Sequence, residues 1–202
     1  MPTELENIKQ VLDTAVNNGL CQIVYRESSN KKSLLTLFGE YGQNMYIFHF
    51  AGLSLQSYIE PIGKENEEIV TNMENSGISK WFINLKKLKL VFLNIYNNEL
   101  ADELIKIGIP VVIAGSNPLS DKVAADFATQ FYYSLAKNNT IEFAFNYAAR
   151  YLVMTGEYEE DETTHKKVPK KTKRLIPYKL FYKDEAAKNW RLGDLAIENQ
   201  TF

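Results

Sequence analysis

The sequence predicts an α/β fold with a mostly parallel central sheet. The first observation is the run KLKLVFLNIYNN over residues 87–98, which is nearly unbroken in apolar residues and rich in β-branched and aromatic ones. Such a run is typical of a strand that is covered on both faces of a parallel sheet. The second observation is that two further apolar runs, NMYIFHF at 44–50 and PVVIAG at 110–115, alternate with segments of helical period. This alternation predicts right-handed crossovers, with helices on both faces of the sheet.

The composition is that of a soluble globular protein, which we expect to form one domain over residues 1–202. The net charge of −2 gives no argument for nucleic acid or an anionic membrane. No apolar run approaches the roughly 20 residues of a membrane span, and MPTELENIKQ lacks a signal-peptide pattern. Cys21 is the only cysteine, so neither an internal disulfide nor a Cys/His zinc cluster is expected. We expect a cytoplasmic protein without a metal or cofactor.

The first elements follow from local signals. Thr3 with Glu6 three residues later reads as a capping box, and the helix that it begins is stopped by the Asn-Asn-Gly sequence at 17–19. CQIVY at 21–25 predicts a short strand, and the leucines from 34 onward predict a helix that ends near Gly42.

The middle of the chain continues the pattern on both sides of the long apolar strand. The segments 54–61 and 67–70 predict a small hairpin, and Ile78, Trp81, Phe82 and Leu85 form the apolar stripe of a short helix. After the strand, Asn98 is expected to cap a helix that ends at Gly108.

Two helices and a charged stretch follow. Ser120 is the expected N-cap of a long helix, and Asn139 with Glu142 is expected to cap the next one. Residues 156–175 then carry an acidic run before a basic one, which favours a long solvated polar loop. The alternative is a partner contact through the basic side chains Lys166, Lys167, Lys170, Lys171, Lys173 and Arg174. Residues 177–183 predict a last strand, and 184–202 a closing segment that packs through Trp190, Leu192 and Ala196.

Three segments together resemble a known family. They are IFHFAG at 47–52, LVFLN at 90–94, and GIPVVIAGSNPLSDKVAADFATQFYYSLAKNNTIEFAF at 108–145. Their order is similar to that of the CHAT family, a bacterial branch of caspase-like cysteine peptidases. The resemblance covers roughly residues 5–155 and implies a three-layer α/β/α sandwich. Family members usually begin with an apolar strand, whereas this chain starts at the first helix. Either that strand is lost, or the chain is shortened, or something else fills its position in the sheet. If the position is empty, the exposed sheet edge could accept a strand from another chain.

The family's activity depends on a Cys–His dyad, in which a base beside the thiol generates the thiolate. The position that matches the catalytic histidine is Leu53, and the position that matches the cysteine is Tyr96. Leucine accepts no proton, and a tyrosine hydroxyl with a pKa of about 10 is a poor nucleophile at neutral pH. The resemblance therefore implies a degenerate dyad. It also implies a vestigial peptide cleft, which would comprise His49, Gly52, Ser54, Asn94, Asn97 and Asp121.

Other reactive side chains have ordinary structural explanations. Cys21 at the start of a strand reads as a small buried residue, and His49 as a hydrogen-bonded histidine at a strand end rather than a base. His165 lies among charges and is expected to be exposed, and Ser54 has no base beside it in sequence. Asp121 suits a helix start, where the helix dipole favours a carboxylate.

Two functions follow. The leading hypothesis is a caspase-like pseudoenzyme that acts through protein contacts with an active peptidase, a sensor or a scaffold. The resemblance suggests a setting in bacterial stress response, cell death or antiphage defence. The alternative is a cysteine peptidase with a relocated dyad, built on Cys21 and a histidine. Nucleic-acid binding through residues 166–174 is the weakest option.

Overall fold

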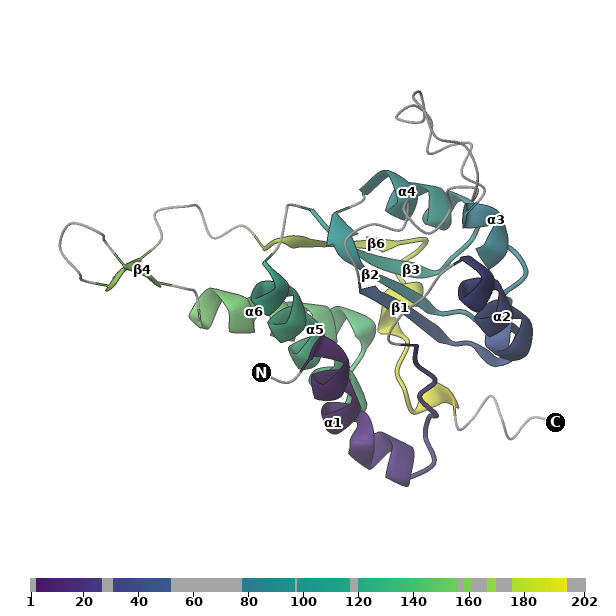
Figure 1. Ribbon diagram of the computed structural model, residues 1–202, viewed down its shortest axis with the longest axis horizontal. Coiled ribbons are helices and arrows are strands. Elements are labelled where there is room, and N and C mark those ends of the chain that lie inside the picture. The colour runs from purple at the N-terminus through teal and green to yellow at the C-terminus, as the bar shows by residue number, and fades with distance from the viewer. Residues whose placement is uncertain are drawn as a thin grey trace. The chain divides into compact units, whose positions relative to one another are not determined.

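The chain forms two compact units. A computed structural model describes residues 3–26, 31–51, 78–96, 98–116, 120–155, 158–160, 167–169 and 176–195 (Figure 1). The first unit comprises residues 1–23, 119–178 and 191–202, and the second comprises residues 24–118 and 179–190. Helices and strands alternate along the chain, which confirms the α/β class. The single domain expected over residues 1–202 stays a prediction.

The central sheet has the strand order β1-β2-β3-β6, where the strands are Ile47–Ala51, Leu90–Tyr96, Val111–Gly115 and Tyr178–Tyr182. β1 and β2 are parallel, and so are β2 and β3. The backbone amide of Lys183, just after β6, donates to the carbonyl of Pro110, just before β3, over 2.9 Å. The end of β6 therefore lies against the start of β3, and the sheet is mixed. This agrees with the prediction of a mostly parallel sheet.

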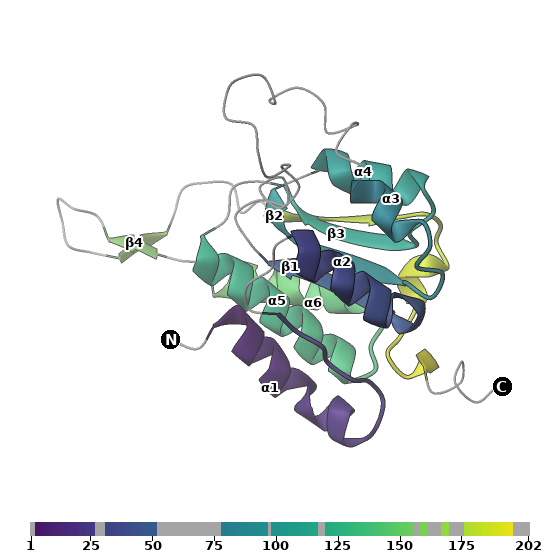
Figure 2. The same ribbon diagram turned by 45° about the vertical axis from the view of Figure 1, so that its right-hand side comes forward.

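The second unit has its apolar core on one face of this sheet. Helices α2 (Lys31–Tyr41), α3 (Ile78–Phe82) and α4 (Asn98–Lys106) supply side chains to that core. Figure 2 shows α3 and α4 together over the strands. The ring of Phe38 lies 5.3 Å from those of both Phe48 and Phe82. Burying each such aromatic or aliphatic side chain contributes about 1.5–3 kcal/mol. The core comprises Leu34, Phe48, Phe50, Phe82, Leu85, Leu88, Val91, Leu93, Leu100, Ala101, Leu104, Ile109, Val112, Ala114 and Phe181.

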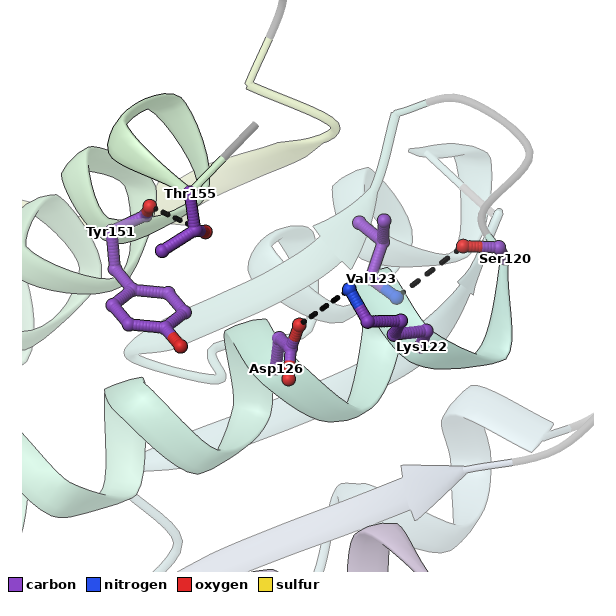
Figure 3. A network of polar contacts seen from close by, with 6 residues as sticks. All are labelled: Ser120, Lys122, Val123, Asp126, Tyr151 and Thr155. Atoms are coloured by element: carbon purple, nitrogen blue, oxygen red, sulfur yellow. Dashed lines mark hydrogen bonds and ion pairs between the residues drawn. The ribbon is translucent and has the colours of Figure 1, made fainter. Parts of the chain in front are cut away.

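The first unit contains three helices, α1 (Glu4–Asn17), α5 (Asp121–Ala136) and α6 (Ile141–Met154). α5 packs against both α1 and α6. The predicted capping box is confirmed, because the Thr3 hydroxyl accepts from the Glu6 amide and the Glu6 carboxylate accepts from the Thr3 amide. Ser120 caps α5 as predicted, by accepting from the Val123 amide over 3.3 Å (Figure 3).

Within the long charged loop predicted over 156–175, the structure describes a short two-stranded ladder. β4 (Tyr158–Glu160) pairs antiparallel with β5 (Lys167–Pro169). Glu160 lies directly opposite Lys167 in the register. This pairing joins residues that are several positions apart in sequence, so it has no local sequence signal.

Three expectations about local structure were wrong. Residues 21–25 form no strand, because β-propensity alone gives no strand without a partner to pair with. The cap of α6 is Thr140, whose hydroxyl accepts from the Phe143 amide, rather than Asn139. Asn98 is the first residue of α4 rather than its cap. The hairpin expected over 54–70 and the role expected for Ala196 lie outside the described residues. Trp190 and Leu192 are buried, as expected for a closing segment.

Candidate functional site

The carboxyl ends of β1 and β2 form the edge where open α/β sheets usually carry their functional groups. The register places His49 opposite Phe92, and Ala51 opposite Asn94. Two residues of the predicted cleft therefore lie on neighbouring strands, with His49 in the middle of β1 and Asn94 nearer the carboxyl end of β2. Their side chains share the face opposite the core described above, because Phe50 and Leu93, the alternate residues, belong to that core.

His49 is held by an aromatic stack. Its imidazole ring lies 4.6 Å from the Phe92 ring, with 21° between the two planes. A flat stack of this kind fixes the imidazole through apolar contact over its face and leaves its two nitrogens at the ring edge. The arrangement supports the structural role expected for His49.

A bulge interrupts the pairing of β2 with β3 at the same end. Leu93 lies opposite Ala114, and the next pair is Tyr96 opposite Gly115, so two residues of β2 have no counterpart on β3. One of these is Asn94, which is only 7% exposed. Bulges re-aim side chains and are common beside functional sites. The bulge therefore separates Tyr96, which ends β2, from the regular ladder.

Asn98 is a polar residue of this edge that sequence reasoning assigned only to a helix cap. Its side-chain oxygen is buried, and the described residues offer it no hydrogen-bond donor. An acceptor in that state is costly unless a donor reaches it. The only sequence signal was the Asn97-Asn98 pair after the strand. The Asn98 amide oxygen is therefore an acceptor at this edge whose donor the described residues do not supply.

The remaining predicted residues lie either outside the described part of the chain or in another segment. Gly52, Leu53, Ser54 and Asn97 lie outside the described residues. Asp121 is an exposed residue of the first unit, where it is the first residue of α5 after the Ser120 cap, as the helix dipole favours. Of the six basic residues proposed for a partner contact, only Lys167 is in a described segment, β5. His165 also lies outside.

Cys21 has the environment of an unreactive thiol. It is a partly buried free cysteine of the first unit, and burial raises the pKa of its thiol. A catalytic cysteine requires the opposite shift, because the thiolate is the nucleophile. His49, the histidine of the described residues, belongs to the second unit, whereas Cys21 belongs to the first.

The described residues contain no group of three His, Cys, Asp or Glu side chains that could hold a metal ion. Among the helices in the described part, none is long and apolar enough to span a bilayer. No protein-family model matches this chain, and no curated protein matches its sequence. Function is therefore inferred from the residues of the sheet edge and of the helical unit.

Proposed function

We propose that this chain is a caspase-like pseudopeptidase of the CHAT type, which acts in the cytoplasm through protein–protein contacts rather than through catalysis. The observation that carries the proposal is the stacked, structural placement of His49, in the middle of β1, on Phe92 of β2. In the family pattern this residue is the non-catalytic histidine. The catalytic positions would then be Leu53 and Tyr96, neither of which supplies a base or a thiol.

The fold is compatible with this assignment. Three parallel strands, β1 to β3, are followed by β6 at the far edge, and the crossover between β2 and β3 is the helix α4. Many unrelated proteins share such sheets, so the fold alone fixes no function. The support comes from the combination of that order with the residues at the strand ends.

Restoring the dyad tests the assignment directly. In a Cys21→Ser background, Tyr96→Cys introduces the only thiol, and Leu53→His adds the missing base. If the two positions face each other as in a caspase-like site, we expect the double variant to react with iodoacetamide at neutral pH at least about tenfold faster than Tyr96→Cys alone. The matched control combines Tyr96→Cys with Ser54→His. Equal rates in all three variants would contradict the caspase-like alignment.

The catalytic alternative needs a separate measurement. A peptide library incubated with the native chain should show no cleavage above that of a heat-denatured sample. Turnover that disappears in Cys21→Ala would instead establish a cysteine peptidase with a relocated nucleophile. The raised pKa of the Cys21 thiol argues against this outcome, because the thiolate fraction at neutral pH falls.

The sheet also offers a contact for a partner strand. β1 has a neighbouring strand on one side only among the described strands. The Leu90 amide donates to the Tyr46 carbonyl over 3.2 Å, so the backbone groups of Ile47 and Ala51, which alternate with those of Tyr46, point away from β2. Self-association through this edge is expected to raise the mass seen by light scattering at high concentration. An Ile47→Pro variant should lower that mass, because proline blocks an added strand.

A protein partner can be sought with two baits, the intact chain and a version that lacks residues 157–174. A stoichiometric partner retained only by the intact chain would assign the contact to the charged segment. A partner retained equally by both would assign it elsewhere on the molecule, and binding lost in 1 M salt would mark the contact as ionic.

A further inference from the structure

The helices α5 and α6 present an exposed apolar surface in the first unit. They are joined by the short link 137–140 and are antiparallel neighbours (Figure 1). Large apolar side chains on their outer sides are unusually accessible, and exposed groups of this kind mark interaction sites. We call this surface the aromatic face; its members are Tyr133 at 41%, Phe143 at 53%, Tyr147 at 38% and Met154 at 86% exposure.

The spacing of these residues makes a straight ridge. In α6, Phe143, Tyr147, Arg150 and Met154 follow one another at intervals of four, three and four, so they lie along one side of the helix over roughly 16 Å. The buried residues Ile141 and Phe145 lie on the opposite side. The Tyr133 ring of α5 lies 6.1 Å from the Tyr147 ring, which extends the ridge across both helices.

Two cations lie beside the ridge. The Lys137 ammonium lies 5.5 Å from the centre of the Tyr133 ring, and Arg150 is exposed within the ridge. No described carboxylate forms an ion pair with either cation. At the other end of α5, Lys122 and Asp126 are 3.7 Å apart and neutralise each other (Figure 3). Glu142 precedes Phe143 in α6, and Lys137 and Arg150 are the cations of the aromatic face that no described carboxylate pairs with.

We propose that the aromatic face docks an amphipathic helix of a protein partner, whose apolar stripe is bordered by aspartates or glutamates. Ridges of this spacing fit the grooves of another helix, and the two cations select carboxylates beside its apolar stripe. A second copy of the same face would bring like charges together across a symmetric contact. Single-stranded nucleic acid requires a longer track of cations along its phosphates. The inference extends the proposed interaction role and holds whether or not the fold is caspase-like.

A displayed library of helical peptides tests the proposal on the full chain. The peptides carry a fixed leucine stripe, and the bordering positions vary among Glu, Lys, Gln and Ser. We expect selection to enrich Glu at the borders, and a selected peptide to bind Phe143→Asp at least about tenfold more weakly. Tyr147→Gln, which suits an exposed helix position, should also weaken binding. The matched control is Ile83→Asp, at an exposed apolar residue of the other unit, with affinity within about twofold of the native chain.

Charge reversal distinguishes this docking mode from non-specific hydrophobic binding. The variant Arg150→Glu should bind the Glu-bordered peptide more weakly than the native chain does. It should bind a Lys-bordered peptide with the same leucine stripe more tightly. Enrichment of Lys borders, no enrichment at all, or equal binding to the α6 variants would overturn the proposal. So would a dimer that Phe143→Asp dissociates, or an oligouridylate gel shift that Arg150→Glu removes without any peptide binding. Circular dichroism and the unfolding midpoint confirm that each variant is folded.

Discussion

The side-chain oxygen of Asn138 accepts a hydrogen bond from the backbone amide of Gly193, with 2.9 Å between the two atoms. The residues are 55 positions apart in sequence, so the bond ties the segment after α5 to the C-terminal part of the same unit. Asn138 has a φ of 62°, in the left-handed region where asparagine is tolerated better than most residues. A Cβ at Gly193 would lie 2.7 Å from the Asn138 oxygen. The contact therefore depends on the side-chain oxygen of Asn138 and on the absence of a side chain at Gly193.

Substitutions at this contact should be coupled. Gly193→Ala is expected to lower the free energy of unfolding by about 1–3 kcal/mol, because the new methyl group displaces the Asn138 side chain. Asn138→Gly should cost about 1 kcal/mol, since it loses the bond but keeps the backbone conformation, and Asn138→Ala should cost more. In the Asn138→Gly background, Gly193→Ala should cost less than alone. The coupling is measured by urea unfolding of the native chain, the single variants Gly193→Ala and Asn138→Gly, and the double variant that combines them. Strict additivity would show that the contact does not form.

A second test concerns the contact between α3 and α4. The hydroxyl of Ser79, which is only 6% exposed, donates to the Glu103 carboxylate over 2.5 Å. Ser79→Ala removes this charge-assisted bond and should lower the free energy of unfolding by about 1.5–3 kcal/mol. Ser79→Ala in a Glu103→Gln background should cost less, because the acceptor is then neutral. An equal loss in both backgrounds would assign the effect to packing.

The elements with local signals were predictable from sequence. The capping box of Thr3 and Glu6 and the Ser120 cap each involve residues three positions apart. The burial of β2 could be predicted from its own apolar sequence. The segment at 21–25 was mistaken for a strand, because strand formation requires a neighbour whose position the segment does not encode. The ladder of β4 with β5 was missed because each strand has only three residues and is formed by pairing with the other, which neither segment shows by itself.

The candidate site was predictable only in part. Asn94 was identified from its place at the end of an apolar strand, and the structure puts it there. The bulge between Leu93 and Tyr96 and the stack of His49 on Phe92 both depend on the register between strands. The hydrophobic pattern of a strand shows which face of the sheet each side chain is on, but it does not show which residue of the next strand lies opposite. The unsatisfied oxygen of Asn98 was missed, because its burial depends on groups that are distant in sequence.

The stack of His49 on Phe92 predicts which substitutions the sheet tolerates. His49→Phe keeps a flat ring against Phe92 and should change the free energy of unfolding by less than about 1 kcal/mol. Phe92→Ala should cost about 3–5 kcal/mol, because Phe92 is fully buried. Thermal unfolding measures both. A large loss in His49→Phe would show that the imidazole nitrogens, rather than the ring face, hold the residue in place.

The capping box makes the start of α1 sensitive to acid. The pKa of Glu6 is lowered, first by the hydrogen bond from the Thr3 amide and then by the Thr3 side chain. A carboxylate with a lowered pKa in the folded state stabilises the fold above its usual value of 4.5, and this contribution is lost as the pH falls through the lower folded value. The stability difference between the native chain and Glu6→Gln should therefore vanish in acid. A difference that persists at pH 2 would contradict this. Thr3→Ala should cost about 1 kcal/mol at neutral pH.

The thiol of Cys21 provides a chemical test of its environment. Because burial raises its pKa, the thiolate fraction at pH 7 is smaller than that of a free cysteine. Alkylation by iodoacetamide should therefore be slower than that of N-acetylcysteine at pH 7, and its rate should rise to a plateau only at a more alkaline pH. The same chain in guanidinium chloride is the control, and it should react at the rate of the free thiol. Reaction of the folded chain faster than the free thiol at pH 7 would indicate an activated thiolate and would favour the peptidase with a relocated dyad.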